Sequence, residues 1–245
     1  PRHDDGRPSF KLEHLSAANG LAHAQAHDAL SDVRATIALA ALIRNRQPRL
    51  WNFCLALRQK QAVLTEIGSD RPFIHVSAMY GAERGGMAVV WPLAQHPTNR
   101  NELIVWDLIH DPAELADLDA EQIRLRLFSK TEDLPEGMTR LPIRSLAINK
   151  SPIVIGNLKV LTPAVIERWH IDMETIARHT ETARRLTPQL ASRMDEVYQR
   201  PRPQGPAPDV DGDLYGGFIG NDDRRRLDDW RERLDATASQ AAASP

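Results

Sequence analysis

A proline-rich stretch near the C-terminus, Arg200–Pro208, most constrains how this chain can fold. Four of its nine residues are proline, which lacks the backbone N–H that a helix interior or a central strand requires. We therefore expect a semi-rigid linker over 200–208. It should separate a large folded part before it from a short segment, 209–245, after it.

Before residue 70 the apolar residues recur with the 3.6-residue period of an amphipathic helix. The pattern predicts a short helix over 10–18, a long helix over 29–44 that ends before Pro48, and a further helix over 51–67. The side chains expected to face inward are Leu30, Val33, Ile37, Ala40 and Ala41 in the long helix, and Leu55, Val63 and Leu64 in the one after it.

Between residues 73 and 155 the pattern changes to short β-branched or aromatic runs bounded by glycine, proline and asparagine, which is typical of strands. The expected strands are 73–77, 88–91, 103–106, 142–148 and 153–155. Further helices are expected over 119–128, 163–169, 173–185, 188–198 and, capped by Asn221, 222–234. These segments predict a small β-barrel or curled sheet with helical insertions, whereas residues 236–245 need not be ordered.

The composition narrows the class of protein. With 42% hydrophobic and 26% charged residues it is that of an ordinary soluble globular chain, and no apolar run approaches the roughly 20 residues of a membrane helix. The net charge of −2 does not indicate a nucleic-acid-binding protein, although it allows a local basic face. A single cysteine, Cys54, favours a reducing compartment, so we expect a cytoplasmic protein without a membrane partner.

The most informative short motif is His27-x-Ala29-x-x-Asp32, at the start of the long helix. Asp32 falls on the flank of the apolar stripe, where a carboxylate can point into a cleft and hold a divalent metal. His27 comes just before the helix, where a neutral imidazole can accept the proton of an attacking water. The spacing is therefore compatible with metal-assisted hydrolysis.

Two other interpretations of these residues stay open. A histidine and an aspartate at a helix start are most often capping or solvated groups, and so short a motif recurs by chance. Alternatively, His23 and His27 are four residues apart and could bind zinc with Asp32 as a third ligand, if both were helical.

The sequence around the motif resembles the last nuclease motif of the bacterial exodeoxyribonuclease I family, four-acid (DEDD-type) 3′→5′ exonucleases. The matching residues are Leu12–Leu15, Ala18–Gly20, Ala26–Ala29, Asp32-Val33 and Ala35-Thr36. Further blocks look like that family in the same order along the chain. They are Arg46–Leu50, His75–Ala82, Pro92–Ala94, His96-Pro97, Asn99–Asn101, Ile148–Pro152, Val210-Asp211, Leu214-Tyr215 and Gly217-Phe218.

The resemblance implies a multi-domain α/β protein that degrades single-stranded DNA from its 3′ end to mononucleotides with Mg²⁺. It implies that residues 1–47 are the end of an RNase H-like exonuclease domain and 48–199 an SH3-like β-barrel domain with helical insertions. After the linker, 209–245 would begin an α-helical domain. By the matching motif, Asp32 corresponds to the last of the four metal-binding acids and His27 to the general base.

The family's other three acids precede this motif, and this chain has only Asp4, Asp5 and Glu13 before His27. Two later Asp-x-Glu pairs, at 119–121 and 172–174, open predicted helices and are interpreted as N-terminal helix charges. The chain also begins with proline. We therefore expect a C-terminal fragment of the enzyme that has no appreciable nuclease activity alone, because a two-metal site needs several carboxylates.

A groove for single-stranded DNA combines cations with aromatic platforms. The cations expected to contribute are Arg71, Arg84, Arg100, Arg124, Arg126, Lys130, Arg144 and Lys150, and the aromatic residues near them in sequence are Tyr80, Trp91 and Trp106. For the tryptophans, core packing is the favoured alternative. The charges of 222–233 alternate in sign, which favours a solvated helix face with i, i+4 pairs such as Asp222 with Arg226 and Asp229 with Arg233.

The family also binds the acidic C-terminal tail of single-stranded-DNA-binding protein (SSB), for which Arg71, Arg84 and Lys150 are the expected contacts. We expect a monomer. The alternative function is a non-catalytic module of the same ancestry that only binds single-stranded DNA or the SSB tail, and a zinc-stabilised structural protein is a third.

Overall fold

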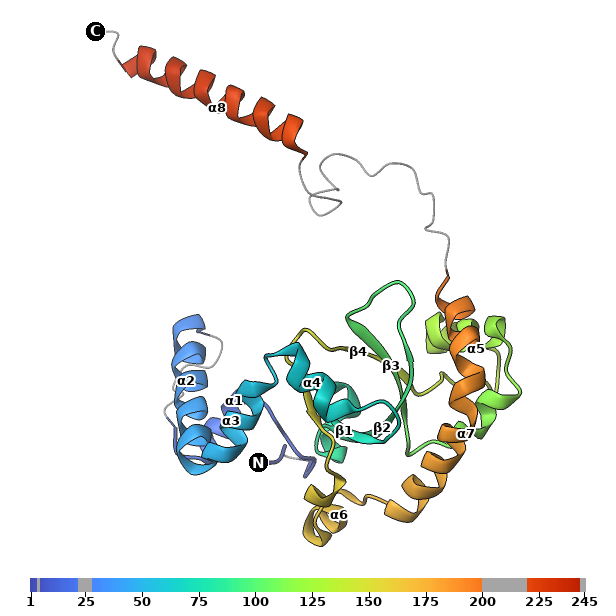
Figure 1. Ribbon diagram of the computed structural model, residues 1–245. Helices are drawn as coiled ribbons and strands as arrows, with labels where there is room; N and C mark the ends of the chain where they lie inside the picture. Colours follow the sequence, from blue (N-terminus) through green and yellow to red (C-terminus); the bar gives the residue numbers. More distant parts are fainter. Residues whose placement is uncertain (4, 22–27, 200–219, 243–245) are drawn as a thin grey trace. The chain divides into compact units, whose positions relative to one another are not determined.

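The computed structural model describes residues 1–3, 5–21, 28–199 and 220–242 (Figure 1). The chain divides into two compact units, residues 1–200 and 201–245. The predicted linker at 200–208 lies outside the described residues, as does His27. None of the helices in the described part of the chain is long and apolar enough to span a membrane.

A five-stranded antiparallel sheet in the order β4-β3-β2-β1-β5 forms the centre of the first unit (Figure 1). The strands are β1 (Phe73–Val76), β2 (Met87–Gln95), β3 (Glu102–Asp107), β4 (Ile143–Ala147) and β5 (Ile153–Ile155). All five predicted strands are therefore present, with β2 four residues longer at its C-terminal end than expected. Trp91 faces Trp106 in the β2–β3 register, and the register shifts between Pro92 and Ala94.

Successive side chains of a strand point to opposite faces of the sheet, so the sheet supports two cores. One core contains Trp91, Ile104 and Trp106, and the long helix α7 packs against it. The other contains Phe73, Val90, Val105 and Val154, with Val63 and Ile67 of α4. Both tryptophans are almost completely buried, as the core-packing alternative predicted. Their indole N–H groups donate to Thr187 Oγ1 at 2.7 Å and to the His110 carbonyl at 2.8 Å, respectively.

Helix α7 (Met173–Tyr198) is continuous, so the predicted break between 185 and 188 is wrong. Proline inside a helix removes a hydrogen bond and costs about 3 kcal/mol in isolation. Here the buried stripe that includes Leu186 and Leu190 continues past Pro188, and its packing on the sheet outweighs that cost. Tertiary packing commonly overrides such local preferences.

Helices α5 (Ala120–Phe128) and α6 (Pro163–Trp169) lie where the sequence predicts them. Asp119 caps α5, accepting from Gln122 N at 2.8 Å within a capping box. Asp172 caps α7, accepting from Thr175 N at 3.0 Å, and this backbone hydrogen bond lowers the pKa of Asp172. Both Asp-x-Glu pairs thus mark helix N-termini, as expected.

The N-terminal part contains α1 (Leu12–Ala18), α2 (Ala29–Arg46), α3 (Pro48–Ala56) and α4 (Lys60–Ile67). The single helix predicted over 51–67 is two helices, because the chain turns at Leu57 and buries that side chain in the same core as Val63. This turn leaves Leu55 and Leu64 each 40% exposed, so their predicted inward orientation is wrong.

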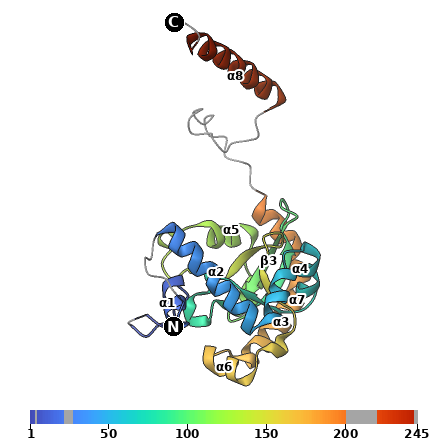
Figure 2. The ribbon, with the colours of Figure 1, turned by 90° about the vertical axis from the view of Figure 1, so that its left-hand side faces the viewer.

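The predicted apolar stripe of α2 also lies on the surface of this structure. Leu30, Val33 and Ile37 are 56%, 55% and 63% exposed, and Ala35 is the helix's buried residue. Figure 2 shows α2 on the outer side of the first unit. The helix packs mainly on α1 and α3, and this packing leaves its apolar stripe uncovered.

The second unit is described as one helix, α8 (Asn221–Ala242). It begins at the predicted cap and continues beyond the predicted end at residue 234, through Ala242. Ion pairs spaced i, i+3 join Asp222 to Arg225, Asp223 to Arg226 and Asp228 to Arg231 along this helix, so Arg226 pairs with Asp223 rather than with the predicted Asp222.

Candidate functional site

The nuclease-like motif lies at the N-terminus of α2. Asp32 is partly buried in the first turn of the helix, and its backbone carbonyl accepts from Thr36 Oγ1 at 2.8 Å. Asp28 caps the helix by accepting from Ser31 N at 2.9 Å. His27 and His23 lie outside the described residues, so the predicted pairing of His27 with Asp32 is not described.

A carboxylate oxygen is a suitable donor for a hard divalent cation, so Asp32 can supply one ligand of a metal site. Within the ranges that the structure describes, no group of three or more His, Cys, Asp or Glu side chains is placed to hold a metal ion.

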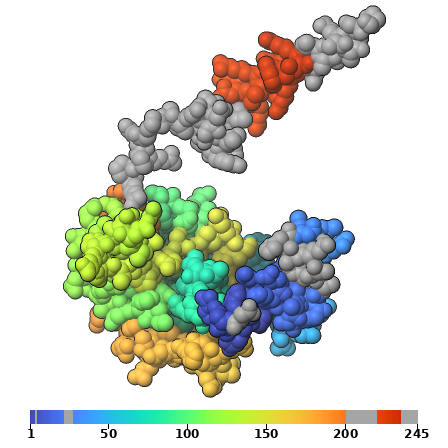
Figure 3. Space-filling model, turned by 180° about the vertical axis from the view of Figure 1, so that it is seen from behind, coloured from blue at the N-terminus to red at the C-terminus, as the bar shows by residue number. Residues whose placement is uncertain are grey.

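A second candidate site is built on the connection between β1 and β2. This segment forms two 3-10 turns, η1 (Ala78–Tyr80) and η2 (Ala82–Arg84). Gly85 follows with a φ of +67°, and a Cβ atom there would lie 2.8 Å from the Trp169 indole, so the turn requires glycine. In the space-filling view of Figure 3 the segment reaches the surface as the turquoise patch near the centre of the unit.

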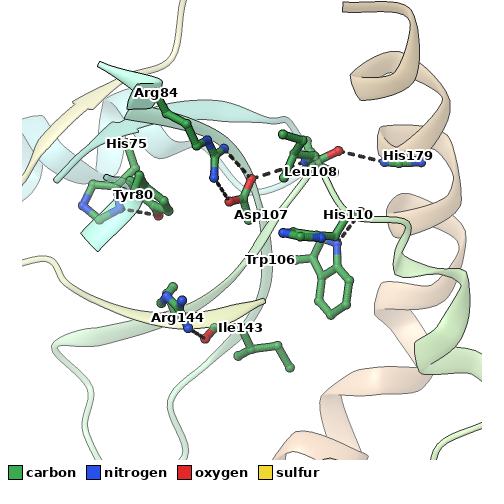
Figure 4. Close-up of polar contacts among 11 residues, drawn as sticks. His75, Tyr80, Arg84, Trp106, Asp107, Leu108, His110, Ile143, Arg144 and His179 are labelled. Atoms are coloured by element: carbon green, nitrogen blue, oxygen red, sulfur yellow. Dashed lines mark hydrogen bonds and ion pairs between the residues drawn. The ribbon is translucent and has the colours of Figure 1, made fainter. Parts of the chain in front are cut away.

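Arg84 holds η2 to the end of β3 through a bidentate ion pair with Asp107 (Figure 4). The two nitrogen–oxygen distances are 2.6 and 3.0 Å, and the side chains of Arg84 and Asp107 are only 27% and 7% exposed. Burial tends to lower the pKa of Arg84, but the hydrogen bonds and charge of Asp107 outweigh it and raise that pKa. The guanidinium also lies over the Tyr80 ring, 5.5 Å from its centroid.

Tyr80 holds η1 to β1 through a hydrogen bond of 2.9 Å between its hydroxyl and His75 Nδ1. Both residues are 5% exposed. Burial lowers the pKa of His75 to about 4 and raises the pKa of Tyr80, so both groups are neutral at pH 7. Tyr80 is therefore an internal anchor of the loop rather than an open stacking platform.

An open pocket of about 290 Å³ lies beside these anchors; we call it the η1 pocket. It is lined by Met79, Tyr80, Gly81, Glu83, Arg84, Asp107, His110, Pro142 and Arg144. Arg144 comes from the edge strand β4 and is partly buried, and it donates to the Ile143 carbonyl at 3.2 Å. Among the ion pairs of the described residues none includes Arg144, so its charge is not neutralised by a carboxylate at contact distance.

The remaining predicted cations do not gather at this pocket. Arg71 donates to the Thr65 and Glu66 carbonyls at 2.9 and 3.2 Å, which closes the C-terminus of α4. Lys150 is exposed in the turn between β4 and β5. Of the other predicted cations, Arg124 donates to carbonyls at the end of α7, and Arg100 is exposed between β2 and β3. Arg126 forms an ion pair with Glu114, and Lys130 forms one with Glu132.

The structure thus brings Arg84, Tyr80 and Arg144 together and leaves Arg71 and Lys150 outside the pocket they form. Sequence reasoning did not identify Met79, Asp107 or His110 as part of the site. A signal for Asp107 was available, since its carboxylate directly follows the apolar run Leu103–Trp106 at the end of the strand.

Comparison with known proteins places this chain in a family. The family model of the Exonuclease I SH3-like domain matches residues 58–200. Among curated proteins, the chain is 39% identical over 229 residues to Exodeoxyribonuclease I of Escherichia coli K12, which covers 93% of this chain and 48% of that protein. Exodeoxyribonuclease I of Haemophilus influenzae is 37% identical over 227 residues and covers 91% of this chain and 48% of its own length. The chain therefore spans about half the length of the curated relatives it matches.

Solved structures give the same result. E. coli Exonuclease I in complex with a dA16 oligonucleotide matches with a TM-score of 0.82 and 38% identity, covering 95% of this chain and 49% of that one. A moderately thermophilic Exonuclease I from Methylocaldum szegediense matches with a TM-score of 0.77 and 39% identity, covering 93% and 47%. These matches confirm the predicted resemblance and the predicted SH3-like sheet. Because the family model covers more than half of its residues, this chain belongs to the Exonuclease I SH3-like domain family.

Proposed function

We propose that this chain is the C-terminal part of a 3′→5′ exonuclease that hydrolyses single-stranded DNA to nucleoside 5′-monophosphates. The observation that carries the proposal is its 39% identity over 229 residues to E. coli Exodeoxyribonuclease I, a span that takes in nearly the whole chain. We place the enzyme in the cytoplasm, as a monomer that acts in DNA repair and recombination.

In this proposal Asp32 is a metal ligand and His27 is the general base. A divalent cation, which we take to be Mg²⁺, polarises the phosphoryl group and activates water when it is bound. Asp32 fits this role because it is an oxygen donor on the first turn of a rigid helix, partly shielded from bulk water. His27 precedes that helix and would accept the proton of the attacking water.

The same proposal assigns each part of the chain to a domain of the enzyme. Residues 1–47 end an RNase H-like domain, 48–199 form the SH3-like domain, 200–208 are the linker and 209–245 begin a helical domain. The exposed stripe of Leu30, Val33 and Ile37 supports the first assignment, since such a stripe requires an apolar surface to cover it. One of the family's four metal-binding acids maps to this chain, so we expect it to be inactive as a nuclease alone.

We propose single-stranded DNA and the SSB tail as partners. The support is that E. coli Exonuclease I has been solved with dA16 and dT13 oligonucleotides, and that another match is a complex of SSB and Exonuclease I with an inhibitor. Arg71 and Lys150, both exposed, are the cations we propose for an acidic tail. Arg84 and Tyr80, also expected at this site, contribute to binding indirectly, because their internal contacts hold the connection between β1 and β2 in place.

A non-catalytic module that binds single-stranded DNA or the SSB tail is the second candidate. It is favoured by the fact that the SH3-like domain has its own two cores within this chain. The coding sequence upstream of Pro1 separates the two: an in-frame Asp-x-Glu strand supports the nuclease, and a start codon immediately before Pro1 supports the module.

DNA binding is tested by the fluorescence anisotropy of a labelled single-stranded oligonucleotide titrated with the chain at several salt concentrations. We expect binding that weakens steeply as salt rises, because phosphate neutralisation releases counterions. A duplex of the same sequence is the matched control and should bind more weakly. No binding, or an affinity that is flat between low and moderate salt, would overturn the proposed partner.

A further inference from the structure

The connection between β1 and β2 is held more firmly than an ordinary surface loop. Two polar pairs anchor it: Arg84 with Asp107, and Tyr80 with His75. Both pairs are largely buried, and burying such groups costs free energy that only good hydrogen bonds recover. The loop conformation is therefore specified in detail, with little freedom left to its side chains.

The anchored loop presents an apolar group to solvent. Met79, immediately before the anchor Tyr80 in sequence, is 45% exposed and lines the η1 pocket. A thioether is polarizable and packs well on flat aromatic surfaces. His110, also exposed, lines the same pocket, and its backbone is fixed by the bond from the Trp106 indole to its carbonyl.

Across the pocket, Arg144 supplies a positive charge. It extends from β4 on the opposite side from Arg84 and Asp107 (Figure 4). The Asp107 carboxylate already accepts two bonds from Arg84 and one from Ile109 N, so it is poorly placed to neutralise Arg144 as well. An arginine in this situation is suited to a phosphate group.

We propose that the η1 pocket binds one nucleotide of a single-stranded DNA, with the phosphate at Arg144 and the base against Met79 and His110. Arg84 and Tyr80 are then positioning residues that fix the loop. The inference rests on the proposed function, because it names where that function's substrate is contacted. It makes Met79 and Arg144 contact residues; Arg144 belongs to the cations expected from the sequence to line a DNA groove, whereas Met79 was not among the expected contacts.

The negative charge of Glu83 provides a test of whether the pocket binds a phosphate. Its carboxylate lines the same pocket and lies over Gly81, so it opposes an incoming phosphate. If the pocket takes a phosphate, removing the two charges must change affinity in opposite directions: Arg144→Gln weakens binding and Glu83→Gln strengthens it.

The first experiment measures the affinity of each variant of the full chain for labelled oligo-dT as salt is varied. Arg144→Gln should lower affinity about tenfold at low salt and reduce the slope of log affinity against log salt by about 0.7, the value of one phosphate contact on a single strand. Met79→Ala should lower affinity about fivefold without changing the slope. Glu83→Gln should raise affinity about twofold.

Lys159→Gln is the matched control, because it removes the charge of an exposed lysine that does not line the pocket. The melting temperature of each variant verifies that it is folded. Equal losses of affinity and slope in Arg144→Gln and Lys159→Gln, or a loss of affinity in Glu83→Gln, would overturn the inference.

A second experiment keeps the inference separate from the proposed function. The chain is labelled on its methionine methyl groups, and their NMR signals are followed while thymidine 5′-monophosphate is added up to about 10 mM. The Met79 signal should shift while that of Met138, outside the pocket, does not. If Met79 shifts but oligo-dT does not bind, the proposed function fails and the pocket stands. If oligo-dT binds but Met79 does not shift, the inference fails alone.

Discussion

The ion pair between Arg84 and Asp107 gives the sharpest prediction about this fold. Replacing Asp107 by asparagine keeps the shape of the side chain but removes its charge. Breaking a fully buried pair costs about 3–5 kcal/mol, whereas an exposed pair is worth about 0–1 kcal/mol. Here the Asp107 side chain is 7% exposed and that of Arg84 27%, so water can partly solvate the remaining guanidinium. We therefore expect Asp107→Asn to lower the free energy of unfolding by about 2–3 kcal/mol, toward the buried limit.

For a unit of this size, that loss corresponds to a fall in melting temperature of about 5–10 °C, measured by circular dichroism at pH 7. The double variant Arg84→Met/Asp107→Leu is the matched control. It leaves no unpaired charge and should recover most of the loss. A change below about 0.5 kcal/mol in Asp107→Asn would refute the reasoning, because the pair would then behave as an ordinary surface contact.

Three further predictions concern other parts of the structure. Because the pKa of His75 is lowered from 6.5 to about 4, the unfolded chain binds a proton that the folded chain does not between those pH values. The free energy of unfolding should be highest above pH 6.5 and fall by about 3 kcal/mol as the pH is lowered to 4. In His75→Asn the denaturation midpoint should depend less on pH across that window; an unchanged pH dependence would count against a buried neutral histidine. Arg71→Gln should cost about 1 kcal/mol and speed hydrogen exchange at the end of α4, since it removes two bonds to carbonyls there; equal exchange would contradict the capping role. Ile37→Glu should change stability by less than about 0.5 kcal/mol because Ile37 is 63% exposed, whereas Val63→Ala in the core should cost over about 1 kcal/mol; similar costs would show that the α2 stripe is covered in this chain.

The strands could be predicted because their signal is local. Each is a short apolar run between turn residues, and all five form in one sheet. The errors arose where a local rule competed with packing. Pro188 predicts a helix end, but the α7 stripe packs on the sheet through that point. The turn at Leu57 carries no glycine or proline, so only the burial of its side chain explains where the helix is interrupted.

The candidate site was less accessible to sequence reasoning, for a different physical reason. Arg84 and Asp107 are 23 positions apart, and only the alignment of β2 and β3 brings them together. Arg144 enters the same pocket from a third strand. The sequence therefore identifies Arg84 as a cation but does not reveal that it is already paired with Asp107. The motif of His27 and Asp32 was recognisable from spacing and resemblance, because both residues lie within one turn of a helix start.

The most direct test of the central claim is the release of 5′-mononucleotides from 3′-labelled single-stranded DNA in the presence of Mg²⁺. It compares this chain alone with the longer polypeptide of which we propose it forms part. We predict that the longer polypeptide releases mononucleotides from the 3′ end, that Asp32→Ala abolishes this release, and that the chain alone binds the DNA without degrading it. Efficient degradation by the chain alone, lost in Asp32→Ala, would contradict the account.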